Sequence, residues 1–229
     1  MDVDKIRIFD QNMDLISVFG LLSTICTIAM MLAGLPLCTQ MMREGTQNVQ
    51  LFPFVAFFTN CMLWSEYGLL KLDKAVIIVN MTGCVLEGLY ILIYFRCTKN
   101  QAMVLQQLFG SFCVIFPSLV YAKFVAASLR SALSVLGAIC VIASVVNFGS
   151  PLADIKRVLQ TKSSESMSLL WCLIAAITAF QWTMYGYLKD DINLIIPNAI
   201  GVGLGAIQLS LIYKYKPKLL TSKISDITF

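Results

Sequence analysis

The sequence contains no histidine, and only 13% of its residues are charged. A soluble domain of similar size carries roughly a quarter charged residues, whereas 58% of this chain is hydrophobic and its mean hydropathy is +0.78. These values exclude an ordinary soluble fold and indicate a polytopic membrane protein. The net charge of +4 is spread over short loops. No basic run resembles a nucleic-acid-binding surface, so we expect no nucleic-acid partner.

The lack of histidine also limits metal and acid–base chemistry. Eight cysteines are present, but none forms a CxxC pair and nearly all lie inside apolar runs, where they are expected as small buried side chains. A zinc site would need cysteine or carboxylate ligands at a spacing that is absent. The sequence also shows no nucleophile–base pair. We therefore expect no metal, no cofactor and no enzymatic activity.

Apolar runs of the length needed to cross a bilayer, about 20 residues, occur seven times, and short segments with most of the charged residues separate them. Glu87 is the one acidic residue inside such a run. We predict an all-α membrane protein with seven transmembrane helices. The predicted spans are Leu15–Met42, Gly45–Ser65, Ala75–Phe95, Asn100–Ala122, Ser131–Ala153, Ser166–Leu188 and Ile192–Tyr213.

An odd number of spans places the two termini on opposite sides of the membrane. With the C-terminus in the cytoplasm, ten lysines and arginines fall on the inner side and seven on the outer side. This difference favours an outside N-terminus under the positive-inside rule. The first fourteen residues lack the basic-then-apolar pattern of a cleaved signal peptide, and we expect them to remain.

The main feature of the sequence is an internal duplication. WSEYGLLKLDKAVIIVNMTG (residues 64–83) and WTMYGYLKDDINLIIPNAIG (residues 182–201) agree at ten of twenty positions without a gap. This pattern predicts two three-helix repeats with one unpaired helix between them. The expected order is an extracytoplasmic tail at 1–14, the first repeat at 15–96, a linker helix at 97–127, the second repeat at 128–213 and a cytoplasmic tail at 214–229.

The single inserted helix decides how the repeats are oriented. Three crossings alone would leave the second repeat upside down relative to the first, and one further crossing restores its direction. We therefore expect two parallel three-helix bundles joined by an inversion linker helix (3+1+3), related by an axis along the membrane normal. Some transporters are built from parallel repeats of this kind.

Two asparagines, Asn80 and Asn198, occupy matching positions in the middle of the third and seventh spans. A carboxamide without a hydrogen-bond partner in hydrocarbon is costly, so each must bind another helix or face a wet cavity. An interhelical hydrogen bond would explain one isolated asparagine. The symmetric pair, each sixteen residues after a tryptophan, favours solute binding.

The tryptophans of the duplicated motif, Trp64 and Trp182, each lie one helical turn beyond a polar residue, Asn60 and Thr178. Each pair therefore shares a helix face. An indole can cover the apolar C–H face of a pyranose, while amides and hydroxyls bind its hydroxyl groups. This arrangement suits a sugar. Anchoring at the lipid interface is the alternative for each tryptophan.

Three prolines, Pro36, Pro53 and Pro151, lie within predicted spans, where proline removes a backbone hydrogen bond and permits a kink. Because Pro36 recurs as Pro151, this pair is a candidate hinge for rocking one repeat against the other. The repeat counterpart of Pro53 is Ser168, which breaks the symmetry.

Tyr67 and Asp73 recur as Tyr185 and Asp191 near the outer ends of spans 2–3 and 6–7. These four residues are candidates for an outer gate, closed through hydroxyl–carboxylate or carboxylate–lysine contacts. Ordinary interfacial tyrosines and loop aspartates are an equally open interpretation.

At this point the sequence resembles a known family, the SWEET (MtN3/saliva) sugar transporters, over roughly residues 18–215. Tryptophan at position 64 is more similar to animal members than to plant members. The motifs that carry the resemblance are GLPL at 34–37, LFPF at 51–54, WSEYG…D…VNMTG at 64–83, GSPL at 149–152, TKSSESM at 161–167 and WTMYG…D…IPNAIGVGLGAIQL at 182–209.

The resemblance implies a facilitator that moves mono- or disaccharides down their gradient by alternating access, often as a homo-oligomer. Its partners would be a sugar and the lipid bilayer, in the plasma membrane or an internal, Golgi-type membrane. The two large indoles favour a glucose-type monosaccharide.

The resemblance also implies roles for individual residues. Asn80 and Asn198 would bind sugar hydroxyls, and Trp64 and Trp182 would stack on the sugar. The rest of the implied pocket consists of Asn60, Thr178, Leu32, Ser144 and Asn147. The four hinge prolines of the family correspond to Pro36, Pro53, Pro151 and Ser168, so the serine departs from the pattern.

Two other functions stay open on the sequence alone. A related three-helix-repeat carrier of another small solute, such as an amino acid, would use Glu87 for proton coupling. Against it, the repeat counterpart of Glu87 is Gly205, no second acid or histidine completes a relay, and no Pro-Gln dipeptide follows a span proline. A non-transporting membrane scaffold is the other alternative. A seven-helix receptor would not repeat internally, and a retinal protein would need a lysine that Ile192–Tyr213 lacks.

Overall fold

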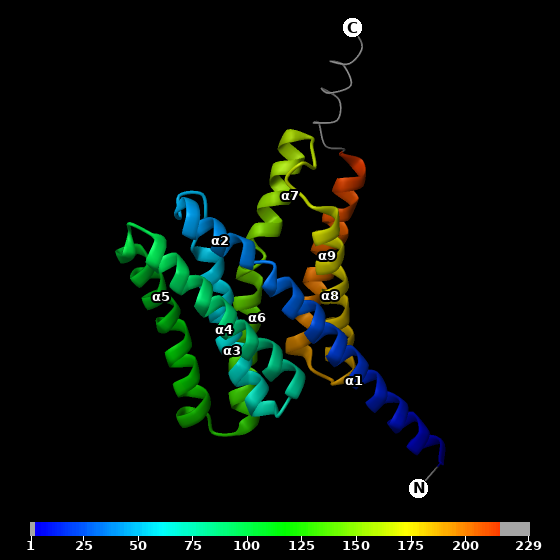
Figure 1. Cartoon of the computed structure of the whole chain (residues 1–229). Helices are drawn as coiled ribbons and strands as arrows, with labels where there is room; N and C mark the ends of the chain where they lie inside the picture. The colour runs from blue at the N-terminus through cyan, green and yellow to red at the C-terminus, as the bar shows by residue number, and fades with distance from the viewer. Residues whose placement is uncertain (1–2, 216–229) are drawn as a thin grey trace. The chain divides into compact units, whose positions relative to one another are not determined.

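The computed structural model describes residues 3–215, with side chains from Met13, and every regular element in this range is helical (Figure 1). This confirms the predicted all-α fold. The elements are α1 (Val3–Leu32), α2 (Leu35–Glu44), α3 (Phe52–Lys71), α4 (Lys74–Cys97), α5 (Gln101–Val120), the π-helical turn η1 (Tyr121–Val125), α6 (Leu129–Val146), α7 (Gly149–Thr161), α8 (Leu169–Leu188) and α9 (Ile192–Lys214).

The two predicted tails fall at the limits of the described residues. Because α1 begins at Val3, most of the N-terminal segment expected as a tail is helical. Residues 216–229, which make up most of the predicted cytoplasmic tail, lie outside the described residues.

Six helical segments of the described chain are long and apolar enough to cross a membrane, and they cover six of the seven predicted spans. The remaining span, predicted at Gly45–Ser65, corresponds to α3, which carries Asn60 and Glu66 and is not among these six segments. Both predicted ends of this span are wrong, since the helix starts at Phe52 and continues to Lys71. The hydropathy of the sequence falls at Glu66, but the helix continues through this polar residue to Lys71.

The chain divides into two compact units, one of residues 20–147 and one of residues 1–19 and 148–229. In the first unit α3 is the central helix and packs against α4, α5 and α6. Its side chains Cys61 and Leu63 are completely buried. In the second unit α9 packs against α8 and α7. The fifth predicted span is therefore divided, because α6 packs within the first unit while α7 belongs to the second.

The first and fifth spans are each broken just before the repeated proline. Residues 33–34 separate α1 from α2, and residues 147–148 separate α6 from α7. Pro36 and Pro151 each lie in the first turn after the break. Proline is tolerated there because the first N–H groups of a helix have no partner within it. The two interruptions lie where the sequence predicts kinks.

The second proline position differs between the repeats. Pro53 lies in the first turn of α3. Its counterpart Ser168 is the N-cap of α8, and its hydroxyl oxygen accepts a hydrogen bond from the Trp171 N–H at 3.4 Å. Both residues therefore stand at the start of a helix rather than in its interior. A serine satisfies this position by capping an otherwise unpaired backbone N–H.

The repeated Tyr-Gly pair explains how consecutive helices meet closely in each repeat. A Cβ at Gly186 would lie 2.9 Å from Leu194 Cβ, and one at Gly68 would lie 3.0 Å from Val76 Cγ1. Only glycine leaves room for α9 against α8 and for α4 against α3 at these points. The duplicated motif therefore specifies a close helix–helix contact twice.

Candidate functional site

Three of the predicted site residues form one hydrogen-bonded chain in the first compact unit. The indole N–H of Trp64 donates to the Ser144 hydroxyl oxygen at 3.0 Å. The same hydroxyl donates to Asn60 Oδ1, also at 3.0 Å. Trp64 is buried, and the other two side chains are half-buried. Because α6 packs against α3, a residue predicted for the second repeat completes a polar cluster of the first.

The paired asparagines have the same local geometry in both repeats. Asn80 Nδ2 donates to the Val76 carbonyl at 2.9 Å, and Asn198 Nδ2 donates to the Leu194 carbonyl at 2.8 Å. Both residues are half-buried. Each carboxamide uses one N–H on its own helix, and the second N–H and the oxygen make no hydrogen bond with another described residue. These groups are available to a polar ligand.

The second unit contains Trp182 and Thr178, one turn apart on α8. Trp182 is 8% exposed and Thr178 is 7% exposed. Among the described residues the Thr178 hydroxyl has no hydrogen-bond partner. An unpaired buried hydroxyl costs free energy, which is recovered if water or a ligand hydroxyl binds it.

Two further residues that the sequence assigns to the pocket lie where spans are broken. Leu32 is the last residue of α1 and is 42% exposed. Asn147 is the C-cap of α6, and its Nδ2 donates to the Ala143 carbonyl at 3.2 Å. Both therefore occupy the joint between two helices.

The helix ends that precede the α3–α4 and α8–α9 turns carry matching aromatic stacks. In the first repeat the Trp64 and Tyr67 rings meet edge to face with centroids 5.2 Å apart, and the Lys71 ammonium lies 5.7 Å from the Tyr67 centroid. The equivalent series in the second repeat is Trp182, Tyr185 and Lys189, with distances of 5.5 Å and 5.8 Å. Such T-shaped and cation–π contacts fix the ring orientations. The tyrosines therefore hold the tryptophans in place.

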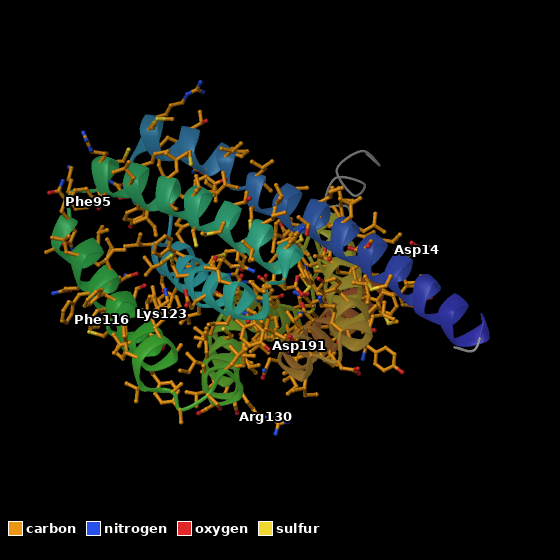
Figure 2. The ribbon with its side chains drawn as sticks, turned by 90° about the horizontal axis from the view of Figure 1, so that it is seen from below. Asp14, Phe95, Phe116, Lys123, Arg130 and Asp191 are labelled. Atoms are coloured by element: carbon orange, nitrogen blue, oxygen red, sulfur yellow. The ribbon has the colours of Figure 1, made fainter. Side chains whose placement is uncertain are left out.

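The aspartates predicted for the outer gate are helix caps. Asp73 precedes α4 and accepts a hydrogen bond from the Val76 N–H at 3.2 Å. Asp191, labelled in Figure 2, precedes α9 and accepts from the Asn193 and Leu194 N–H groups at 3.1 and 3.4 Å. Both aspartates are 4% exposed. A carboxylate at this position also stabilises the helix dipole. A gating role stays a prediction.

One ion pair was missed from the sequence. Glu66 lies in α3 with its side chain 8% exposed, and its Oε2 is 3.3 Å from Lys123 Nζ. Lys123 belongs to η1, the wide turn at the end of α5 (Figure 2). Glu66 was overlooked because the predicted second span stopped at Ser65. Glu66 therefore joins Glu87 as a buried acidic side chain within a helix.

The structure thus brings some predicted site residues together and leaves others in separate units. Asn60, Trp64 and Ser144 are joined by hydrogen bonds. The other predicted pocket residues of the first unit are Leu32, Asn80 and Asn147, and those of the second unit are Thr178, Trp182 and Asn198.

Comparison with known proteins gives a consistent result. The family model MtN3_slv, described as "Sugar efflux transporter for intercellular exchange", matches twice, over residues 17–102 and 134–219. The chain is 33% identical to Sugar transporter SWEET1 of Rattus norvegicus, over 86% of this chain and 91% of the rat protein. It is 30% identical to Bidirectional sugar transporter SWEET15 of Oryza sativa subsp. japonica, over 87% of this chain and 64% of the rice protein.

A solved structure of a eukaryotic SWEET transporter is similar in fold, with a TM-score of 0.81 and 24% sequence identity. The match covers 90% of this chain and 98% of the other. The fold likeness agrees with the sequence matches, which cover most of the chain and include both copies of the duplicated motif. The chain belongs to the MtN3/saliva (SWEET) family.

Proposed function

We propose that this chain is a facilitative, bidirectional sugar transporter that moves a glucose-type monosaccharide across a membrane. The observation that carries the proposal is the duplicated pair of tryptophan and asparagine. Each indole is buried, and each carboxamide keeps one N–H and its oxygen for a ligand. Flat apolar rings combined with amides match the two kinds of surface on a pyranose. Relatives in an animal and a plant are named sugar transporters, which supports the substrate class.

In this proposal the binding residues fall into three groups. Asn80 and Asn198 bind sugar hydroxyls through the amide groups that their own helices leave unused. Trp64 and Trp182 stack on the C–H faces of the ring. The remaining members of the binding set are Asn60, Thr178, Leu32, Ser144 and Asn147. Of these, Thr178 has an unpartnered buried hydroxyl, a group that gains most from a ligand.

Transport would proceed by alternating access, with bending at the broken spans. The interruptions at residues 33–34 and 147–148 lack continuous helical hydrogen bonding, so they are the places where backbone rotation costs least. Pro36 and Pro151 keep the helices from closing across them. Pro53 and Ser168 complete the proposed hinge set, and Tyr67, Asp73, Tyr185 and Asp191 are proposed for the outer gate.

The proposed topology has the N-terminus outside and the C-terminus in the cytoplasm, in a homo-oligomer. The count of basic residues on the two sides supports this orientation. A cysteine-labelling experiment on intact cells would test it. In that experiment a cysteine introduced at Asp190 should react with an impermeant maleimide, and one introduced at Glu44 should not.

The deciding experiment is radiolabelled glucose uptake into proteoliposomes that contain the purified protein, with sucrose in parallel and with or without a proton gradient. We expect glucose to equilibrate without accumulating, with little sucrose entry. Accumulation above equilibrium would contradict a uniporter. Absence of flux for both sugars would contradict sugar transport and favour another solute or a scaffold.

A proton-coupled carrier is the second candidate, because Glu87 is a buried acid in α4 that is 6% exposed. Under the uniporter proposal, Glu87→Gln should leave glucose uptake as insensitive to an imposed pH gradient as the unaltered protein. If the unaltered protein accumulates solute with the gradient and the variant does not, coupling through Glu87 replaces the uniporter.

A further inference from the structure

The hydrogen-bond chain through Ser144 has a fixed direction. An indole N–H can only donate, so the Ser144 hydroxyl must accept from Trp64. A serine hydroxyl has a single hydrogen, and that hydrogen is directed at Asn60 Oδ1. Its donor and one of its two acceptor positions are therefore used within the protein. Ser144 therefore keeps one acceptor position for a ligand.

The same direction determines how the Asn60 amide is turned. Because Asn60 Oδ1 accepts from Ser144, the amide oxygen faces Ser144 and the NH2 group points elsewhere. Among the described residues this NH2 makes no hydrogen bond. Without the serine, the amide oxygen and nitrogen would be nearly equivalent in shape and free to exchange places. The hydrogen bonds through Ser144 thus fix the orientation of the Asn60 amide, so that its NH2 group is a defined donor one turn from Trp64.

The residues at the matching positions of the second repeat are of other types. When Pro36 is matched to Pro151, the counterpart of Ser144 is Ala29, which has no hydroxyl. The counterpart of Asn60 is Thr178, a hydroxyl that can both donate and accept. The two repeats therefore differ in hydrogen-bonding groups at matching positions. The first has an amide NH2 that donates, and the second has a hydroxyl that can donate or accept.

We propose that Ser144 is a positioning residue that holds the Trp64 indole and turns the Asn60 NH2 toward the sugar, so that the first repeat recognises a sugar oxygen as a hydrogen-bond acceptor. This inference rests on the proposed sugar transport and deepens it. The site would then distinguish the two sides of a hexose, with one hydroxyl required only to accept.

Sugar analogues test this requirement directly. A fluorine accepts a weak hydrogen bond but donates none, while a deoxy position does neither. We expect one ring position at which deoxyfluoroglucose competes for uptake nearly as well as glucose and deoxyglucose competes roughly 3- to 10-fold less well, the range for one neutral hydrogen bond. In Ser144→Ala this difference should disappear, because the amide loses its fixed orientation. Persistence of the difference in that variant would overturn the proposal.

A double-mutant cycle separates positioning from direct binding. Trp64→Phe keeps an aromatic ring but removes the N–H, and Ser144→Ala removes the hydroxyl. Because both changes break the same chain, their combined effect on the half-saturation concentration should be no larger than that of the stronger single change. Additive effects would mean that Ser144 acts independently of Trp64. Ser144→Thr, which keeps a hydroxyl, should restore most of the discrimination.

The matched control is Ser210→Ala. Ser210 is an exposed serine on α9 whose hydroxyl donates only to the Ala206 carbonyl of its own helix, at 2.7 Å, so analogue discrimination should not change. A spectroscopic readout is independent of transport and of correct substrate assignment. In protein carrying Trp171→Phe and Trp182→Phe, the ultraviolet resonance Raman band that reports indole N–H hydrogen bonding should shift when Ser144 is replaced by alanine.

The Raman band and the glucose flux distinguish a failure of this inference from a failure of the proposed function. An unchanged Raman band would overturn the hydrogen-bond chain whether or not the protein carries sugar. A shifted band together with absent glucose flux in the unaltered protein would overturn the proposed function, and with it the sugar as the ligand of Asn60.

Discussion

At the ends of α3 and α8 the first and second repeats carry the same series of residues, with Trp64, Tyr67 and Lys71 in one and Trp182, Tyr185 and Lys189 in the other. The contacts differ at the positions that meet the linker helix. In the first repeat Thr59 Oγ1 is 2.6 Å from Ser111 Oγ of α5, and Glu66 pairs with Lys123 of η1. The 118-residue offset places Ile177 and Met184 at those two positions of the second repeat.

This difference shows what happens to a duplicated unit when a single helix is inserted between the copies. The linker packs against α3 of the first repeat and also against α6, where the Tyr121 hydroxyl of η1 lies 3.0 Å from the Ser131 hydroxyl. The tyrosines that contact the tryptophans and the aspartates that cap α4 and α9 stay alike in both copies. The residues of the duplicated motif therefore stay alike in both repeats, whereas the polar contacts that α3 makes with α5 and η1 involve residues that differ between the repeats.

The largest expected effect is on glucose flux, and it tests whether the two repeats contribute equally to transport. Asn198→Ala should abolish glucose flux with expression intact, because it removes the amide that is available to the sugar, and Asn80→Ala should do the same. Counterflow of labelled glucose in proteoliposomes measures both. Undiminished flux in either variant would remove that asparagine from the proposed site and make the repeats unequal in function.

The next effect concerns the linker. Lys123→Leu leaves the buried Glu66 carboxylate without its partner, and we expect a loss of about 3 kcal/mol, at the low end for such pairs because Lys123 is half-exposed. Thermal denaturation in detergent would register this change. The double variant Glu66→Met, Lys123→Leu, which places at position 66 the methionine of the second repeat, should recover most of the stability. No recovery would show that the pair is not the main attachment.

Alanine substitutions at the two repeated glycines should lower stability by different amounts. Gly186→Ala should destabilise by about 2 kcal/mol, because its Cβ would meet the rigid Cβ of Leu194 at 2.9 Å. Gly68→Ala should cost less, since its Cβ would meet Val76 Cγ1, a side-chain terminus, at 3.0 Å. The thermal denaturation midpoints of the two variants show which substitution costs more stability. Equal midpoints would mean that the helix pairs adjust equally well.

The smallest effect on stability is expected at Ser168, the position where the second repeat lacks the proline of the first. Ser168→Pro removes one capping hydrogen bond of 3.4 Å, a loss of about 1 kcal/mol, and its backbone φ of −87° is close to the value that proline requires. The variant should fold and transport. Loss of folded protein would mean that the start of α8 cannot accept the proline that the family carries.

Much of this architecture could be predicted from the sequence because it depends on local patterns. Apolar runs predict helices, and a 118-residue duplication predicts two repeats with matched tryptophans and asparagines. The break before Pro36 and Pro151 was also predictable, since proline acts on the backbone of its own helix. The ends of α3 were not, because polar residues continue a helix that hydropathy ends.

The contacts between helices could not be predicted in this way. Helical spacing indicates that Asn60 and Trp64 share a face, but it does not indicate that Ser144, eighty positions further along, lies against that face. The Glu66–Lys123 pair depends on η1, where the Ala126 N–H bonds to the Tyr121 carbonyl at 2.9 Å. This wider turn changes the direction of Lys123 relative to a regular helix. No residue pattern in the sequence marks it.

The packing of α6 against α3 has an evolutionary consequence. The compact unit of residues 20–147 includes a helix from the second copy of the duplicated segment, so the boundary of folding and the boundary of duplication do not coincide. A gene cut at the repeat boundary would encode a chain that contains Asn60 and Trp64 without the helix that carries Ser144. A single copy of the duplicated segment would therefore need a second chain to supply that helix.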